Sequence, residues 1–249
     1  MNDLNDFVER YIAVWNEADS ARRRERIAAL WTPHGASLQR VLEPRGHAAI
    51  EQRVAASWDK WVHGRGCVFR SARHATGHHD AVMCNWQMVA PDGTVLSLGL
   101  TFLMLDPYGL VHTELQFPEP PPAPRPEHEA LIGHYVAAWN EADAVARRAR
   151  IQTVWRPEGA HVNAERTCAG HAAIEVEASR VWASCGAHGQ RFRCSGRIDG
   201  HHGAVRMDWE LIGDDGVSVL AAGTNLLLTD QHGRIERDLQ FDQPALRAG

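Results

Sequence analysis

Three ionisable residues alternate with apolar residues in one short segment near the end of this 249-residue chain. They are Arg206, Asp208 and Glu210. In a β-strand, alternate residues point to the same face, and residues two apart lie about 6.5–7 Å from each other. Arg206 can therefore reach Asp208 and keep its carboxylate ionised. The spacing favours acid/base chemistry with Asp208 as the base, Arg206 as its orienting partner, and Glu210 or His201 as an assisting group.

The opposite interpretation rests on the residues between these three. Val205, Met207 and Trp209 make the other face of the same strand apolar, and apolar faces usually point to the core. The charged residues then lie on the outer surface of the sheet, where they are suited to an interface rather than to catalysis. The sequence leaves both interpretations open, because alternation does not say which face lines a cavity.

The chain contains an internal repeat, which indicates two copies of one domain. The series Tyr11-x-x-x-Trp15-Asn16-Glu17-Ala18-Asp19 returns 124 residues later from Tyr135, and Gly46-His47-Ala48-Ala49-Ile50-Glu51 returns unchanged from Gly170. We predict a first domain at residues 1–117 and a second at 127–249. Between them lies the proline-rich segment 118–126, whose prolines favour a stiff, extended linker.

Each copy is expected to begin with helices and to end with strands. In the first copy, apolar residues at helical spacing predict a first helix. Asp19-Ser20 is expected to cap a second helix, which includes Trp31 and ends at Pro33. A third helix carries an apolar stripe made of Ile50, Val54, Trp58 and Trp61. Alternating segments then predict strands at residues 68–73, 81–89, 95–105 and 110–117. Helices followed by strands imply an α+β fold.

This element order, with Trp-Asn-x-x-Asp from Trp15 and Gly-His-x-x-Ile from Gly46, resembles the SnoaL-like branch of the nuclear transport factor 2-like superfamily. The resemblance covers residues 5–117 and 129–242. It implies two tandem cone-shaped domains, each with three helices packed on a curved, mostly antiparallel sheet around a cavity. Proteins of the family that share this fold include ketosteroid isomerase, limonene epoxide hydrolase, polyketide cyclases and non-catalytic binding proteins. Its members commonly pair through their sheets, which implies an intramolecular pseudo-dimer that is a monomer in solution.

The resemblance also suggests roles for single residues. Arg206-x-Asp208 is similar to the catalytic pair of limonene epoxide hydrolase, and Asn163 is an approximate match to the water-holding Asn of that family. The family's second carboxylate is replaced here by Gln240, so epoxide opening would require Glu210 or Asp238 as the acid.

The first copy lacks the ionisable trio. Met83, Asn85 and Gln87 stand at the matching positions, so the first copy is expected to support the second rather than to act. An indole offers a broad apolar surface and one N–H donor, which makes the paired tryptophans candidates for cavity walls, with core packing as the alternative. The ligand-binding candidates are Trp15, Trp31, Asn85 and Gln116 in the first copy, and Trp139, Trp155, Asn163 and Gln240 in the second.

Several histidine and cysteine groups have a spacing that suggests metal ligands, but we predict no metal site and no cofactor. Neighbouring strand residues point apart, which separates His78 from His79 and His201 from His202. The pairs His47/Glu51 and His171/Glu175 are four apart on a helix, a spacing that suits either ion pairing or metal binding. Cys185, His188 and Cys194 have no evident fourth ligand.

Charge and hydropathy narrow the range of partners. The 26 Lys and Arg residues against 31 Asp and Glu give a net charge of −5, without the basic excess that nucleic acid or anionic lipid requires. No segment approaches the roughly 20 apolar residues of a membrane helix, and the N-terminus lacks the basic and apolar regions of a signal peptide. The five cysteines form no Cys-x-x-Cys motif. We expect a cytoplasmic protein with reduced thiols, no nucleic-acid partner and no membrane partner.

Together these patterns predict a protein that binds a small, largely apolar organic molecule. As an enzyme, it would use the second cavity for cofactor-free acid/base chemistry, as an isomerase, a cyclase or a hydrolase. As a non-catalytic ligand-binding or interaction module, it would use the polar strand residues to build the interdomain interface. The sequence does not name the substrate of either.

Overall fold

The computed structural model describes residues 2–72 and 75–242 of the chain. The chain divides into two compact units, Met1–Pro120 and Pro121–Gly249, and each is described by itself. Arg73, at the end of the first predicted strand, lies outside the described residues, as do residues 1, 74 and 243–249. None of the described helices is both long enough and apolar enough to cross a membrane.

The described part of the first unit contains three α-helices. They are α1 (Asn2–Asn16), α2 (Ser20–Leu30) and α3 (Gly46–Ser57), the last continued by the π-helical turn η1 (Trp58–His63). The Asp19 side chain accepts hydrogen bonds from the backbone N–H groups of Ala21 and Arg22. This cap explains why a new helix begins directly after α1.

One boundary differs from the prediction. Trp31 does not belong to α2 but begins strand β1 (Trp31–Leu38), so the expected helical position of Trp31 is wrong. β1 pairs with β6 at Trp31 and again only from Ala36, with an irregularity between. Pro33 lies in this unpaired part, where its missing N–H removes no hydrogen bond from the ladder.

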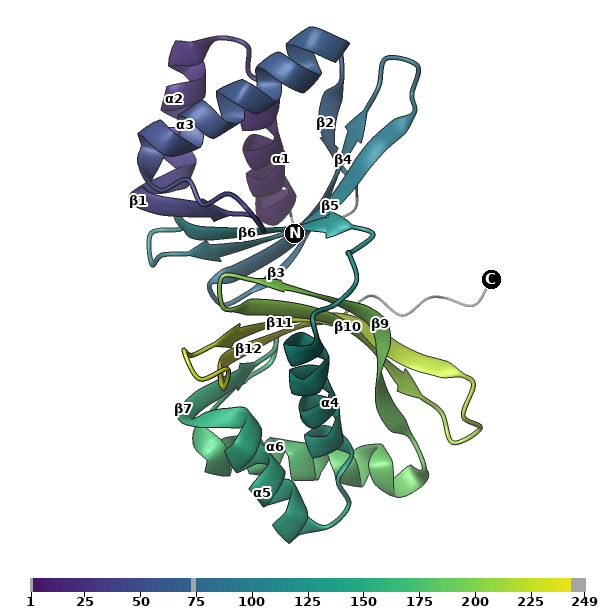
Figure 1. Ribbon diagram of the computed structural model, residues 1–249. Coiled ribbons are helices and arrows are strands. Elements are labelled where there is room, and N and C mark those ends of the chain that lie inside the picture. Colours follow the sequence, from purple (N-terminus) through teal and green to yellow (C-terminus); the bar gives the residue numbers. More distant parts are fainter. Residues whose placement is uncertain (1, 73–74, 243–249) are drawn as a thin grey trace. The chain divides into compact units, whose positions relative to one another are not determined.

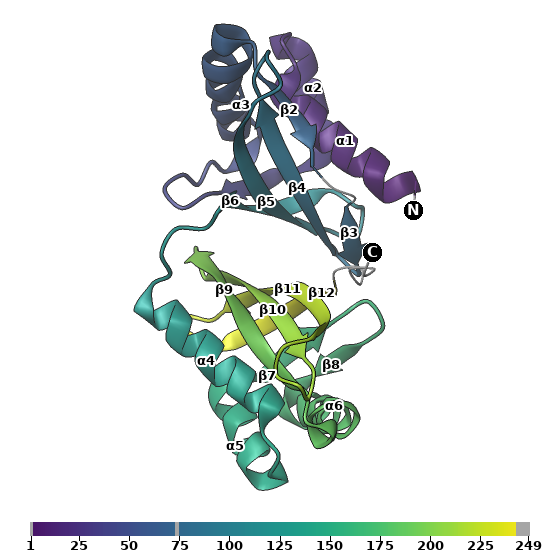
Figure 2. The ribbon, with the colours of Figure 1, turned by 90° about the vertical axis from the view of Figure 1, so that its right-hand side faces the viewer.

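The remaining strands of the first unit form one curved sheet. They are β2 (Val68–Ser71), β3 (Thr76–His78), β4 (Ala81–Val89), β5 (Val95–Leu105) and β6 (Val111–Glu119). The order is β1-β6-β5-β4-β2, with β3 also on β4, and the β1/β6 pair is parallel while the others are antiparallel. The three helices lie on one face of this sheet (Figures 1 and 2).

The second unit repeats this order. It contains α4 (Pro126–Asn140), α5 (Ala144–Val154), β7 (Trp155–Val162), β8 (Thr167–Ala169), α6 (Gly170–Ser184), the short helix η2 (Gly186–His188), β9 (Arg191–His201), β10 (Ala204–Ile212), β11 (Val219–Thr229) and β12 (Ile235–Asp242). The strand order is β8-β7-β12-β11-β10-β9. The prediction of an α+β fold with three helices on a curved, mostly antiparallel sheet in each copy is confirmed.

The core of each unit lies between its helices and the inner face of its sheet. In the second unit, Tyr135 and Trp139 of α4 pack with Met207 and Trp209 of β10. The indole of Trp209 lies against Gly223 of β11, where an added Cβ would be 2.5 Å from a ring carbon. Glycine at this position therefore allows the indole to lie flat on the sheet and to form part of the wall of the cavity described next.

Candidate functional site

The second unit encloses a cavity of about 260 Å³ between α4, α6 and the inner face of the sheet. Its walls carry aromatic side chains, including Trp139, Phe192 and Trp209, together with polar groups from several strands. A hollow lined by aromatic side chains and by convergent polar groups is typical of a small-molecule site.

A buried carboxyl group organises the polar wall of this cavity. Asp238 of β12 has no solvent exposure, and three neighbours contact its side chain. The Tyr135 hydroxyl donates to Oδ2 over 2.8 Å, the Asn225 amide donates to Oδ1 over 2.6 Å, and Nδ1 of His161 lies 2.7 Å from Oδ2. This carboxyl group is held from both sides, so it has one fixed orientation.

These contacts determine how the imidazole of His161 is used. Because Asp238 accepts hydrogen bonds from its neighbours, we assign the shared proton to Nδ1 of His161, which leaves the lone pair on Nε2. His161 lines the cavity, and its ring centroid lies 4.8 Å from that of Trp139. The arrangement is that of a general base oriented by a carboxyl group.

Tyr135 and Asn225 complete this cluster. Burial, followed by the nearby Asp238, raises the pKa of Tyr135 well above its usual value, so the phenol stays a hydrogen-bond donor near neutral pH. The Asn225 amide also donates to the Tyr135 hydroxyl over 2.8 Å, while its own Oδ1 has no hydrogen-bond partner among the described residues. Asn225 lines the cavity and can accept a hydrogen bond from a ligand.

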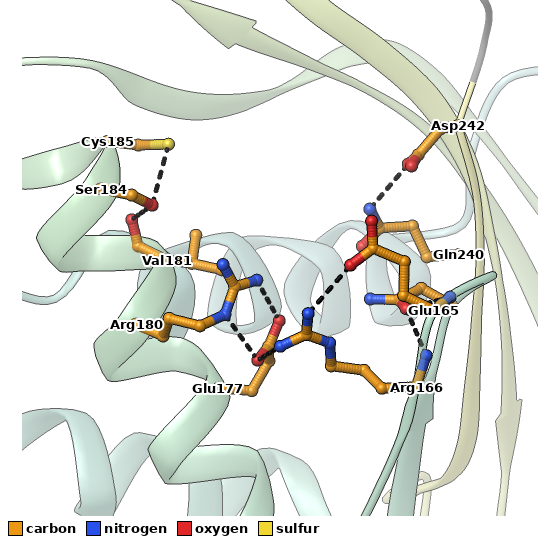
Figure 3. A network of polar contacts seen from close by, with 10 residues as sticks. Glu165, Arg166, Glu177, Arg180, Val181, Ser184, Cys185, Gln240 and Asp242 are labelled. Carbon is orange, nitrogen blue, oxygen red and sulfur yellow. Dashed lines mark hydrogen bonds and ion pairs between the residues drawn. The ribbon is translucent and has the colours of Figure 1, made fainter.

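An ion-pair network lies at one side of the same cavity (Figure 3). Glu177 of α6 is nearly buried and accepts from Arg180 over 2.6 and 3.0 Å and from Arg166 over 3.2 Å. Arg166 also pairs with Glu165 over 2.9 Å. The hydrogen bonds from Arg180 are the main reason that the pKa of Glu177 is lowered. The negative charges of the two glutamates and the positive charges of the two arginines thus compensate each other.

The first unit has a larger cavity, of about 460 Å³, with a different set of polar groups. Glu114 takes the place of Asp238 and is fully buried; it accepts hydrogen bonds from the Tyr11 hydroxyl and from the Gln116 amide. Burial raises the pKa of Glu114. Ser37 stands where the second unit has His161, so this cavity has a buried acid but no imidazole beside it.

The structure corrects the expected position of the ionisable trio. Met207 and Trp209 line the cavity, so the alternating residues Arg206, Asp208 and Glu210 lie on the other face of β10. Asp208 accepts from the Thr224 hydroxyl over 2.8 Å, and Glu210 accepts from Arg193 over 2.8 Å. The physical reason is the burial of the large indole on the inner face. Of the two interpretations of the sequence, the structure therefore fits the one in which the trio lies on the outward face of the sheet, away from the cavity walls.

His201, the expected assisting group, is also absent from the cavity walls of the second unit. It pairs with Ala204 at the end of β10, and directly paired residues share one face of a sheet. Because Ala204 is two residues from Arg206, His201 lies on the outward face as well. The position of His201 therefore does not suit it to assist a reaction inside this cavity.

The ligand-binding candidates divide into two groups. Five of them line a cavity: Trp15 and Gln116 in the first unit, and Trp139, Asn163 and Gln240 in the second. Trp31 and Trp155 are fully buried in the cores and are not cavity walls. Asn85 lies on the face of β4 opposite the cavity residue Trp86. These last three therefore do not line the cavity of their own unit.

The helical His/Glu pairs have structural roles in both units. Nε2 of His47 lies 2.8 Å from the Trp31 carbonyl oxygen, while Glu51 accepts from Arg23. His171 and Glu175 repeat this arrangement with Trp155 and Arg148. Among the residues that the structure describes, no three His, Cys, Asp or Glu side chains come together as metal ligands would.

The sequence interpretation missed His161 and Tyr135, and considered Asp238 only as an alternative acid. One signal could have found them, because the repeat aligns Tyr11 with Tyr135 and Glu114 with Asp238. A tyrosine and a carboxyl group kept in both copies indicate a shared cluster. His161 lies in the segment before the third helix of its copy, where no motif marked a role, so its position facing Asp238 across the β7/β12 pair could not be anticipated.

Comparison with known proteins gives no activity for this chain. No family model and no curated protein matches the sequence. Half of the chain is similar to SnoaL-like proteins. A candidate isomerase of the SnoaL-like family from Agrobacterium tumefaciens is 28% identical, with 48% of this chain and 100% of that chain covered and a TM-score of 0.45. A candidate polyketide cyclase from Sinorhizobium meliloti is 15% identical, with 46% of this chain and 95% of that chain covered and a TM-score of 0.36. An NTF2-like protein of unknown function from Exiguobacterium is 16% identical, with 46% of this chain and 98% of that chain covered and a TM-score of 0.36.

Proposed function

We propose that the second unit binds a small, largely apolar organic molecule and catalyses a proton transfer on it without a cofactor. The supporting observation is the pair formed by His161 and Asp238 at the wall of an aromatic-lined cavity. Isomerisation, cyclisation and hydrolysis are the reaction classes that such a base serves. This proposal keeps the predicted chemistry and moves it from Asp208 to His161.

In the proposed step, Nε2 of His161 removes a proton from a substrate carbon or from a water molecule. The imidazole then becomes an imidazolium, and the adjacent Asp238 stabilises its charge. Tyr135 and Asn225 keep Asp238 in place through their hydrogen bonds, so the pair does not need to reorganise during the reaction. An isomerisation or a cyclisation is completed when the imidazolium returns the proton to another atom of the substrate.

The cavity walls limit the substrate to a small molecule with apolar surface. Aromatic contact comes from Trp139, Phe192 and Trp209, and the volume of about 260 Å³ is near the lower end of the usual range for ligand pockets. The free Oδ1 of Asn225 gives one acceptor for a hydroxyl or an N–H group of the substrate. A molecule of one or two rings fits this volume.

The proposal can be tested with 2-tetralone, an apolar ketone with acidic C–H groups. In D₂O, a base that removes its α-proton yields an enolate, which then takes up deuterium, and NMR follows the exchange. We expect the wild-type chain to accelerate exchange, and H161Q to lower the rate about 100-fold or to background. D238N should have a similar effect, because an amide no longer fixes the imidazole tautomer.

D208N serves as the matched control. Asp208 is a strand carboxylate on the outward face of β10, so its replacement should leave the exchange rate unchanged. If D208N abolishes exchange while H161Q retains the wild-type rate, the proposal is wrong and the trio regains its catalytic role. Equal rates for the wild type and H161Q would also contradict the proposal.

A second candidate function, as an interaction module, applies to the outward face of the sheet. It is supported by the position of Arg206, Asp208 and Glu210 away from the cavity walls. Under this alternative the trio contributes to the interface between the two copies, and D208N lowers stability without changing ligand binding. Both functions are compatible in one chain, since they use opposite faces of β10.

A further inference from the structure

We infer that the cavity of the first unit is a binding site for an aromatic carboxylate, with Arg53 as the group that recognises its charge. This inference goes beyond the function proposed for the second unit and uses different residues. It starts from a difference in charge between the two cavities. Arg53 of α3 lines the first cavity, whereas Glu177 stands at the same repeat position in the second.

Arg53 is held at the wall but is not neutralised. Its guanidinium lies over the ring of Trp15, 5.2 Å from the centroid, and Nη2 donates to Gln39 Oε1 over 3.3 Å. Its Nε is buried without a hydrogen-bond partner, and no described carboxylate forms an ion pair with it. A partly buried guanidinium with unused N–H donors raises the free energy of the folded chain, and a bound anion that accepts from these donors offsets this destabilisation.

The other lining groups reinforce a positive wall. Arg65 also lines the cavity and lies 4.7 Å from the ring centroid of Trp61. No Asp or Glu is among the described lining residues of this cavity. In the second cavity, by contrast, Glu177 is paired with Arg180 over 2.6 Å, so the charge of this arginine is already compensated from within the protein.

Glu114 is the nearest candidate for an internal partner of Arg53, and its position argues against that role. It is fully buried and is not part of the cavity wall. The Tyr11 hydroxyl and the Gln116 amide both donate to its Oε1, while Oε2 has no hydrogen-bond partner within the described part of the chain, so Arg53 does not reach this carboxyl group with a hydrogen bond. Burial raises the pKa of Glu114 although the charge of Arg53 lowers it, which favours the neutral acid over a counter-ion.

The rest of the wall determines the body of the ligand. Trp15, Trp61 and Trp86, with Tyr11 and Phe69, surround a volume of about 460 Å³. Flat aromatic faces favour stacking with a planar ring, and the forked donors of arginine match the two oxygens of a carboxylate. An aromatic carboxylate combines both features, which a neutral aromatic molecule or a small inorganic anion does not.

Calorimetric titration of the full chain with 2-naphthoate and with its neutral counterpart 2-naphthamide tests this inference. We expect one naphthoate per chain, bound at least about tenfold more tightly than the amide. R53Q should weaken naphthoate binding by about tenfold or more and change amide binding by less than about threefold. R53K, which keeps the charge but loses the forked geometry, should lose less affinity than R53Q.

R180Q is the matched control, because Arg180 is an arginine that lines the second cavity. It should leave the affinity for naphthoate within about twofold of the wild type, since Arg180 is already paired with Glu177. The inference is overturned if R180Q rather than R53Q removes binding, or if naphthoate and naphthamide bind the wild-type chain equally or not at all. If R53Q does not fold, the comparison of the two ligands on the wild type and on R53K decides the question.

Discussion

Nδ1 of His161 lies 2.7 Å from Oδ2 of Asp238, and the same two positions of the first unit are occupied by Ser37 and Glu114. These two differences separate an imidazole paired with a buried carboxyl group from a buried carboxyl group without an imidazole. The frame around both is the same, including a tyrosine that donates to the carboxyl group in each unit. The two copies differ in the chemistry of their cavities more than in their architecture.

The Y135F variant is expected to destabilise the second unit. It removes the donor to Asp238 Oδ2 and the acceptor of one Asn225 contact, leaving buried polar atoms with fewer partners. Loss of such a contact costs about 1–3 kcal/mol in the free energy of unfolding, which urea denaturation measures. Y108F is the control, because Tyr108 is 89% exposed and its variant should stay within about 0.5 kcal/mol of the wild type. Equal stabilities of the two variants would contradict the role of the Tyr135 contacts.

The pKa of Glu114 makes the stability of the first unit depend on pH. Burial raises this pKa above its ordinary value of 4.5, so the folded state binds a proton more tightly than the unfolded state. The contribution of Glu114 is therefore complete below about pH 4.5 and is lost as the pH rises through the folded-state pKa. We expect the free energy of unfolding of the wild type to fall relative to that of E114Q between pH 4.5 and 8, as measured by urea denaturation.

Glu177 is expected to give the opposite pH dependence of stability, and the E177Q variant tests it. The hydrogen bonds from Arg180 lower the pKa of Glu177 below its ordinary value of 4.5. Glu177 therefore contributes its full stability above the pH that equals this ordinary pKa, and the contribution is lost as the pH falls through the folded-state pKa. The difference between wild type and E177Q should therefore shrink on acidification. Parallel pH profiles for the wild type and E114Q would show that Glu114 titrates in the folded chain as it does in the unfolded chain.

Most of the secondary structure could be predicted from the sequence, because each element has a clear period or a cap. The strands at 81–89 and 95–105 agree with β4 and β5, and Asp19 caps α2 as expected. The start of β1 was misplaced because Pro33 and Gly35 follow Trp31 and look like the end of a helix. The local sequence does not show that the parallel strand β6 supplies the backbone hydrogen bonds of this segment.

The site was harder to predict than the fold. Alternation in β10 separates Asp208 from Trp209 correctly, but it assigns neither to the cavity, since that depends on which face the helices cover. His161 and Asp238 are 77 residues apart and meet only because β7 and β12 pair in parallel. A pair of side chains that sheet register brings together leaves no short motif in the sequence.

Gly223 is expected to be essential for the wall of the second cavity. A Cβ at this position would lie 2.5 Å from the ring of Trp209 and 2.6 Å from the Phe241 carbonyl oxygen, and the backbone oxygen cannot move aside easily. G223A should lower the free energy of unfolding by about 1–3 kcal/mol and shift the Trp209 indole in the cavity wall. Thermal and urea denaturation measure the first effect.

G133A is the matched control for that substitution. Gly133 lies on the exposed side of α4, and an added Cβ there would meet no atom within 4 Å. Alanine in the interior of a helix is favoured over glycine by about 0.5–1 kcal/mol, so G133A should stabilise the chain. If both alanine variants change stability in the same direction, the close approach of Trp209 to Gly223 does not govern the packing of the wall.

The duplication leads to a prediction about assembly. Proline-rich residues 118–126 join the two copies, and a short linker gives each copy a millimolar effective concentration of the other. If the copies pair through their sheets, as the pseudo-dimer proposal holds, pairing within the chain prevails over pairing between chains at ordinary protein concentrations. Sedimentation velocity should therefore show a monomer across the micromolar range. A stable dimer of full chains would mean that the outward faces pair between molecules, and it would contradict the pseudo-dimer.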